Sequence, residues 1–217
     1  MISLRLDPAD PQRLGLLLLG AHADDIEIGC GGSVLQLLRR YPGSSVTWIV
    51  FSAPGPRAAE ARASAAEFLA NASARDVRTL DFRESFFPYD GAAIKAAFEE
   101  LKGLAPDLIF THHRSDLHQD HRLIAELTWN TFRDHTILEY EIPKYDGDLG
   151  HPGVFVSIDP EICREKCNLI RKHFVSQRPR HWFDDEVFMG LMRLRGVESR
   201  SPSGYAEAFH GRKLTIR

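Results

Sequence analysis

The fold is decided by LGLLLLGAHADDIEIGCGG, residues 14–32. Its first part, residues 14–21, is almost entirely apolar, as expected of a strand that is buried on both faces of a parallel sheet. The polar sequence AHADD follows directly where this strand ends. Because ligands of open parallel sheets bind beyond the carboxyl ends of the strands, this position predicts a functional site.

Three glycines follow the polar sequence, at Gly29, Gly31 and Gly32. We interpret them as a turn, after which Ser33 caps a helix over residues 34–41. Their spacing, G-x-G-G, differs from the G-x-G-x-x-G of dinucleotide-binding turns. The next predicted strand also ends in FSAPGP, without the acidic residue that would hold a ribose hydroxyl. A dinucleotide site is therefore not expected here.

The rest of the chain alternates short apolar strands with segments of helical length. The next strands are predicted over residues 46–51, 77–82 and 108–111, and the next helices over residues 57–70, 92–104 and 122–133. The alternation is then less clean, with strands over 137–142 and 154–158, helices over 161–174 and 186–194, and a tail, 205–216, that returns to the site or the sheet edge. This order predicts a single α/β domain over residues 1–217. It is a Rossmann-like, mostly parallel sheet flanked by helices, with a less regular C-terminal part.

The composition excludes several classes of protein. Of 217 residues, 43% are hydrophobic and 26% are charged, which is ordinary for a globular protein. A formal charge of −3 gives no basic footprint for nucleic acid, and no apolar run approaches the roughly 20 residues of a membrane span. The N-terminal residues lack the apolar core of a secretory signal, and three cysteines do not make a disulfide framework. We expect a cytoplasmic protein with a small-molecule partner, and the sequence leaves a homo-oligomer open.

His22 and Asp25 are three residues apart in AHADD, so a tight turn could direct both at one metal ion. Imidazole suits zinc and iron, and a carboxylate completes a mixed nitrogen and oxygen site. Asp24 lies beside them without being needed as a ligand. The alternative is that Asp24 and Asp25 only cap a helix and that His22 is an ordinary loop residue.

A second cluster, THHRSDLHQDH, follows the predicted strand LIF and precedes a helix. His118 and His121 are three residues apart, with Asp120 between them, and can face the same cavity. Since the carboxyl ends of parallel strands share one edge, this cluster can meet AHADD in space. Two histidines and one carboxylate leave an open position on a metal, which is typical of catalytic sites. We interpret His112 and His113 as solvated loop residues or as partners within the network.

Together the two motifs resemble those of the LmbE-like, PIG-L family of zinc-dependent de-N-acetylases. That family has an AHPDDE-like motif after its first strand and an HPDH-like motif much later. Here the motifs read AHADDIE and HQDH, so Ala23 and Gln119 stand in place of the prolines. The segments RAAEARASAAEFL, DLHQDHR and GYAEAF are also similar to the family. The resemblance implies an enzyme that uses Zn²⁺ to release acetate from N-acetylglucosamine units within larger molecules.

The resemblance also implies a role for each residue of the motifs. The zinc ligands would be His22, Asp25 and His121. Asp24 would be the general base, and His118 the acid or electrostatic partner of the oxyanion. Asp120 would orient His118. Some relatives place a tyrosine for the oxyanion at the position of Asp116, which cannot serve this purpose as an anion, so the task would fall on zinc and His118.

Four residues are candidates for binding the substrate: Arg57, Glu60, Tyr205 and Glu207. Arg57 and Glu60 begin the helix after the second strand and face the same edge of the sheet, although capping and a surface ion pair would also explain them. Tyr205 and Glu207 lie in the tail that is similar to the family. The aromatic residues in 86–89 could stack on a sugar or form local core.

Two other functions remain open. A non-haem iron oxygenase uses the same set of two histidines and one carboxylate, although the α/β pattern and the additional Asp24 count against it. A binding module that has kept the pocket but lost catalysis is the other, and the presence of both Asp24 and His118 counts against it. Acetate release distinguishes the deacetylase from oxygen consumption with a 2-oxoacid and from sugar binding without turnover.

Overall fold

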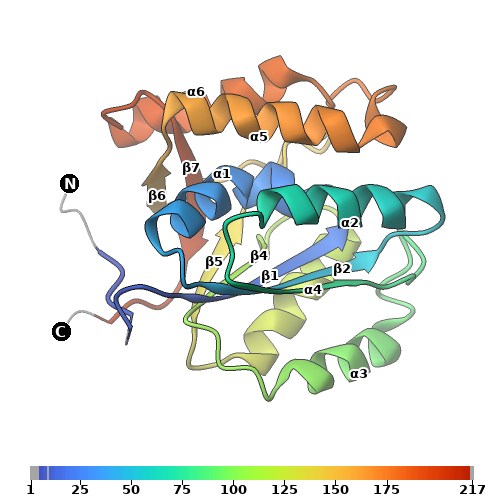
Figure 1. The fold of residues 1–217 in the computed structure, drawn as a ribbon. Helices are drawn as coiled ribbons and strands as arrows, with labels where there is room; N and C mark the ends of the chain where they lie inside the picture. The colour runs from blue at the N-terminus through green and yellow to red at the C-terminus, as the bar shows by residue number, and fades with distance from the viewer. Residues whose placement is uncertain (1–4, 9, 216–217) are drawn as a thin grey trace.

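The computed structural model describes residues 5–8 and 10–215. Seven strands form one sheet, and helices cover both of its faces (Figure 1). The strands are β1 (Gly15–His22), β2 (Ser45–Ser52), β3 (Ala74–Thr79), β4 (Leu108–His112), β5 (Thr136–Tyr140), β6 (Val154–Ser157) and β7 (Ala206–Gly211). The helices are α1 (Asp25–Arg40), α2 (Pro56–Phe68), α3 (Gly91–Leu101), α4 (Gln119–Thr131), α5 (Pro160–His173) and α6 (Asp185–Ser199), with a 3₁₀ turn over Val175–Gln177. Ile216, in the expected tail, lies outside the described residues.

The strand order is β3-β2-β1-β4-β5-β7-β6. The first five strands are parallel, whereas β7 pairs antiparallel with both β5 and β6. The predicted fold class is therefore confirmed, and the less regular C-terminal part is the antiparallel end of the sheet. The tail returns to the sheet as expected, but it enters between β5 and β6.

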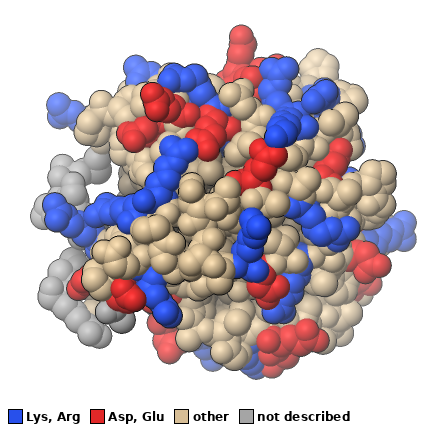
Figure 2. All heavy atoms as spheres, viewed as in Figure 1, with Lys and Arg blue, Asp and Glu red and all other residues tan. Residues whose placement is uncertain are grey.

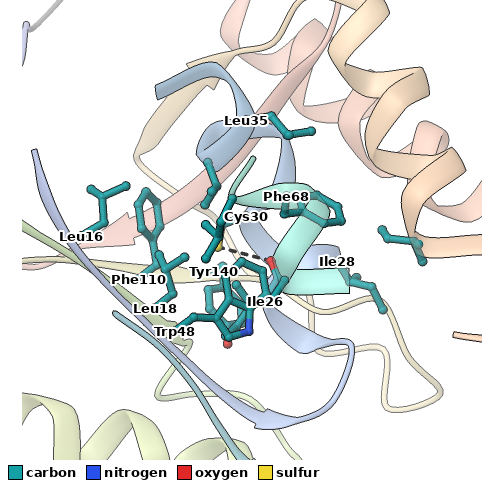
Figure 3. Packing of buried hydrophobic residues seen from close by; sticks show 14 of the residues in the cluster. Leu16, Leu18, Ile26, Ile28, Cys30, Leu35, Trp48, Phe68, Phe110 and Tyr140 are labelled. Atoms are coloured by element: carbon teal, nitrogen blue, oxygen red, sulfur yellow. Dashed lines mark hydrogen bonds between the residues drawn. The ribbon is translucent and has the colours of Figure 1, made fainter. Parts of the chain in front are cut away.

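Side chains of β1 alternate between two apolar cores, one on each face of the sheet. Leu16 and Leu18 belong to the core beneath α1, α2, α5 and α6, part of which Figure 3 shows. Leu17 and Leu19 belong to the core beneath α3 and α4. A strand buried on both faces has to be apolar throughout, which is why residues 14–21 read as a continuous run.

The start of α1 corrects the sequence-based prediction. This helix begins at Asp25, directly after the polar sequence, and not at residue 34. Gly29, Gly31 and Gly32 lie inside the helix instead of forming a turn, and Ser33 is a buried helical residue instead of an N-cap.

Close packing explains why glycines occupy the middle of α1. A Cβ atom at Gly29 would lie 2.2 Å from Cδ2 of Tyr140, and one at Gly31 would lie 2.7 Å from Cε1 of Phe68. Glycine costs a helix about 1 kcal/mol relative to alanine. Here the bulky neighbours in the core leave no room for any other residue, so tertiary packing overrides the local preference.

Gly29→Ala is expected to lower the free energy of unfolding by about 1–3 kcal/mol, which is typical of an overpacked core. Tyr140 cannot easily move aside, because its ring is fully buried and its hydroxyl donates to the carbonyl of Leu19 at 2.6 Å. The matched control is Gly190→Ala in α6, where an added Cβ would meet nothing within 4 Å. Chemical denaturation should show the control variant to be as stable as the parent or more so. Equal stability of Gly29→Ala and the parent would contradict the packing argument.

Other boundaries differ by a few residues from the prediction. β3 begins at residue 74, three residues early, because it pairs with β2 from Ser45 onward. α4 begins at Gln119, also three residues early, and α6 continues to Ser199. The early start of α4 matters for the site, because it places the HQDH motif in the first turn of a helix.

No helix in the described part of the chain is long and apolar enough to cross a membrane. Lysine and arginine side chains are interspersed with aspartate and glutamate on the face that Figure 2 shows. That face therefore carries charges of both signs without a large field of either.

Candidate metal and catalytic site

The two polar clusters meet at the carboxyl edge of the sheet, between β1 and β4. β1 ends at His22, and its neighbours in the sheet are β2 on one side and β4 on the other. The strand order reverses between β1 and β4, and ligands of open α/β sheets bind at such a switch point. The first turns of α1 and α4 bring Asp25 and His121 to this point. The structure thus brings the two clusters together as expected.

The three predicted metal ligands have the spacing of a single bound ion. Nδ1 of His22 lies 3.1 Å from Nε2 of His121 and 3.3 Å from Oδ2 of Asp25. The last two atoms are 3.5 Å apart. Zinc bonds of about 2.0–2.1 Å in a tetrahedral site put neighbouring ligand atoms roughly 3.3–3.4 Å apart. The donor set and its spacing therefore fit a metal ion.

In each histidine of this set, the second ring nitrogen contacts a carboxylate. Oδ2 of Asp120 lies 3.0 Å from Nε2 of His22, and Oδ2 of Asp116 lies 2.9 Å from Nδ1 of His121. Metal-binding histidines almost always donate their second ring N–H to such a partner, which fixes the ring and increases its basicity. Asp116, at the position where some relatives have a tyrosine, thus contacts the predicted ligand His121.

The contacts of Asp120 differ from the prediction. We expected its carboxylate to orient His118, but it contacts His22 and accepts the backbone N–H groups of Ser85 at 2.6 Å and Phe87 at 3.1 Å. Only the backbone N–H of Asp120 reaches His118, donating to Nδ1 at 3.2 Å. Asp120 therefore holds His22, which is a predicted metal ligand, together with the loop after β3.

The charges of the site favour a cation. Burial acts against a charged His22, but Asp25 and Asp120 outweigh it and raise the pKa of His22 to about 10. Burial lowers the pKa of His121 to about 3. One histidine therefore takes up a proton among the carboxylates, and metal binding would release that proton.

Asp24 is a buried carboxylate with one free oxygen. Its side chain is almost fully buried, and within the described structure its Oδ2 atom has no hydrogen-bond partner. Burial and the neighbouring Asp25 raise the pKa of Asp24 to about 6, against the opposing charges of Arg57 and His22. Asp24 stands at the N-cap position of α1, but its side chain makes no capping hydrogen bond. The capping interpretation therefore does not account for Asp24.

His118 is the N-cap of α4 and lies beside the ligands, with its ring centre 4.9 Å from that of His22. Because Nδ1 of His118 accepts the N–H of Asp120, the hydrogen-bond network assigns the proton of the neutral ring to Nε2. Burial and the charge of His22 lower the pKa of His118. His118 is therefore a neutral hydrogen-bond donor at pH 7 rather than an imidazolium.

His112 is the residue whose position the sequence predicted least well. It is fully buried, and its Nε2 atom lies 3.1 Å from Oδ2 of Asp25, while its ring stacks on that of His121. Asp25, His112 and His121 also have the spacing of a metal group, as do His22, His118 and His121. The backbone N–H of Ala21 donates to Nε2 of His112 at 2.9 Å, which occupies the lone pair a metal would need. The interpretation of His112 as a partner within the network is the one that fits.

Two of the four substrate candidates lie on α2. A guanidinium nitrogen of Arg57 lies 3.4 Å from Oδ1 of Asp24 and another 2.7 Å from Glu84, so Arg57 reaches the site. Glu60 accepts hydrogen bonds from the backbone N–H and the hydroxyl of Ser176, at 2.9 and 2.6 Å. The structure thus joins Arg57, but not Glu60, to the residues of the site.

The two candidates in the tail have other partners. Glu207 is buried, forms an ion pair with Lys166 at 2.7 Å and accepts the N–H of Gly32 at 2.8 Å. It holds α1 and α5 against β7, and this structural role replaces the expected substrate contact. Tyr205 lies near Arg193, whose guanidinium is 5.8 Å from the ring centre, and a contact of Tyr205 with substrate stays a prediction.

Asp120→Asn is expected to weaken metal binding about 10–100-fold, as is usual when the partner behind a ligand is altered. The amide can still accept one backbone N–H, but it removes the charge that holds His22. The control is Asp107→Asn, because Asp107 accepts the N–H of Gly15 at 2.6 Å and belongs to the opposite edge of the sheet. Titration with zinc against a competing chelator measures both affinities. Equal affinity of Asp120→Asn and the parent would remove Asp120 from the support of His22.

Fold and site together define a class of protein, in which an α/β sheet carries a histidine and aspartate metal site at its carboxyl edge. The chain belongs to the PIG-L family. The sequence profile of that family, described as GlcNAc-PI de-N-acetylase, matches residues 17–132, which is more than half of the chain. The protein is accordingly a deacetylase with a histidine and aspartate metal site.

The chain is similar to two deacetylases and to a hydratase. It is 29% identical to the uncharacterized deacetylase YaiS of Escherichia coli (strain K12) over 175 residues, which cover 75% of this chain and 91% of that protein. The N,N'-diacetylchitobiose deacetylase of Pyrococcus horikoshii superposes with a TM-score of 0.70 at 18% identity, covering 91% of this chain and 83% of that one. The 4-carboxy-2-hydroxymuconate hydratase GalB of Pseudomonas putida KT2440 has a TM-score of 0.73 at 16% identity, covering 94% and 98%. At such identities the two structures show the fold alone.

Proposed function

We propose that the protein is a zinc-dependent hydrolase that removes the acetyl group from an N-acetylglucosamine-type amino sugar conjugate. The observation that carries this proposal is the triad of His22, Asp25 and His121, whose ligand atoms are 3.1–3.5 Å apart beside the free oxygen of Asp24. The family profile and the similarity to the chitobiose deacetylase support the choice of an acetylated amino sugar.

Asp24 carries out the proton transfers of the reaction. A zinc ion held by the triad would supply an activated water and polarise the acetyl oxygen. Oδ2 of Asp24 accepts the proton of the attacking water, and a pKa of about 6 suits a base that works near neutral pH. Asp24 then returns this proton to the leaving nitrogen. The products are acetate and a free amine.

His118 and Arg57 assist Asp24 in the proposed reaction. The Nε2–H of neutral His118 donates to the oxygen on which negative charge develops, which stabilises the transition state without an imidazolium. Arg57, 3.4 Å from Oδ1 of Asp24, orients the base and favours its ionised form. Asp116 carries a negative charge and therefore cannot bind the oxyanion. This task belongs to His118, and a bound zinc ion would share it.

The experiment is a screen for acetate release over N-acetylglucosamine conjugates, with purified protein whose zinc content has been measured. Acetate and free amine should form in equal amounts and only with the metal-loaded protein. Turnover of a 2-oxoacid with oxygen would favour the iron oxygenase instead, and tight sugar binding without acetate would favour the binding module. Neither alternative is supported by the family to which the chain belongs.

We also propose a cytoplasmic setting. The support is that Cys30, Cys163 and Cys167 are all free and buried, as is usual in a reducing compartment. A homo-oligomer stays a prediction.

A further inference from the structure

Several exposed apolar side chains lie on the loops that leave the carboxyl edge of the sheet, where the site is. Ten large apolar side chains are exposed in the described part of the chain, and five of them lie on the loops that leave the carboxyl ends of β3, β4 and β5. We call these five the apolar rim: Phe86, Tyr89, Leu117, Tyr145 and Leu149. Single exposed apolar residues are normal on a protein surface, whereas their concentration beside one site indicates a binding function.

Each loop of the rim is attached to a carboxylate of the site. Ser85, which precedes Phe86, donates its N–H to Asp120 at 2.6 Å. Lys144, which precedes Tyr145, donates to Oδ2 of Asp116 at 2.9 Å. Asp120 and Asp116 are the carboxylates that contact the predicted metal-binding histidines. Phe86 and Tyr145 therefore each directly follow a residue that holds one of these carboxylates.

The loops are also bound to one another. The backbone N–H of Leu117 donates to Asp148 at 2.7 Å, and the ammonium group of Lys144 lies 2.6–2.7 Å from both oxygens of the same carboxylate. The side-chain amide of Gln119 donates to the carbonyl of Ser85 at 3.1 Å. The polar atoms of the loops are thus used to fix the loops, while the apolar side chains are left facing solvent. Tyr89 is 83% exposed and Tyr145 is 71% exposed.

We propose that the apolar rim binds an apolar group that the substrate carries next to its N-acetylated sugar. The enzyme then acts on amphipathic conjugates, in which an alkyl or aromatic group is attached to the sugar, in preference to free or all-polar N-acetyl sugars. A conjugate with its acetamide at the metal triad has to place its remaining part against these loops, which argues for the substrate itself as the occupant. This inference rests on the proposed function and names the class of its substrate.

The first test compares octyl and methyl glycosides of N-acetylglucosamine with the zinc-loaded protein. The octyl compound should have a kcat/KM at least about tenfold higher, since one additional methylene in an apolar site is already worth roughly 10–200-fold. The gain should appear in KM, because the apolar group lies away from the reacting bond. Equal values would overturn the inference and leave the proposed function intact. Absence of acetate from both compounds and from the whole screen would overturn the proposed function.

A measurement of glycoside binding tests the apolar rim independently of catalysis. Zinc-loaded Asp24→Asn protein should bind the octyl glycoside at least about tenfold more tightly than the methyl glycoside, measured by calorimetry. Equal affinities would overturn the inference whatever the rate of reaction.

The second test removes part of the rim. The double variant Tyr145→Ser, Leu149→Ser should lose most of the preference for the octyl compound, so that the ratio of the two kcat/KM values approaches one. The control is Leu6→Ser, Leu214→Ser, which replaces exposed side chains that lie before β1 and after β7, outside the loops of the rim. The control should keep the preference, and thermal unfolding checks that both variants are folded. An unchanged preference in the rim variant would overturn the inference.

Two further measurements distinguish other occupants of the rim. Sedimentation with phosphatidylcholine vesicles tests a membrane surface, and the molar mass in solution tests a second copy of the chain. The inference expects neither association to depend on the rim. Vesicle binding or dimerisation that the double variant abolishes would assign the rim to that occupant and overturn the proposal.

Discussion

Asp24→Asn should reduce the rate of deacetylation about 10²–10⁴-fold while the protein keeps its metal. An amide cannot accept the proton of the attacking water, and it has no acidic proton to return to the leaving amine. The substitution keeps the size of the side chain, and Asp24 is not one of the three ligand residues. Since Asp24 makes no side-chain hydrogen bond to cap α1, the helix should remain intact. Elemental analysis and the rate of acetate release give the two readouts.

The matched control is Asp90→Asn. Asp90 occupies the N-cap position of α3 and likewise makes no capping hydrogen bond, but it does not belong to the site. This variant should retain both metal and activity. If Asp24→Asn turned over at nearly the parental rate with full metal content, the role of the base would belong to another group.

The second large effect is expected for His121→Ala, which should weaken metal binding by more than about 100-fold. Loss of a partner behind a ligand already costs about 10–100-fold, and loss of a ligand costs more. His121 belongs to both groups of residues that have the spacing for a metal, and it also completes the triad with His22 and Asp25. Its removal should therefore weaken metal binding to this extent whichever of these sets holds the ion. Full metal occupancy in His121→Ala would show that the ion lies elsewhere.

His118→Ala and His112→Ala then distinguish the sets. Both variants should keep most of the metal if the triad of His22, Asp25 and His121 is the ligand set. His118→Ala should still lose activity, because it removes the donor to the oxyanion. Loss of metal in His118→Ala or in His112→Ala would assign that histidine to the ligands.

The sequence predicted the meeting of the two polar clusters because it depends on topology alone. Each cluster follows an apolar strand, and the carboxyl ends of parallel strands lie on one edge of the sheet. His112 was less predictable, since a histidine at the end of an apolar strand can face the solvent or the interior with the same local sequence. Lys144 carried no signal, because its partner Asp116 is 28 residues away in the chain.

The local features follow from the amino-acid sequence: the apolar strands, the helical periods, and the residues that can bind a metal or move a proton. These follow from side-chain chemistry and spacing within a few residues. Three other features depend on tertiary contacts: Asp120 holds His22 and not His118, Glu207 is buried against Lys166, and α1 runs through its glycines. These outcomes depend on which distant atoms reach hydrogen-bond or packing distance. That distance results from the packing of several elements at once, whereas hydrophobic period and spacing report only on neighbours along the chain.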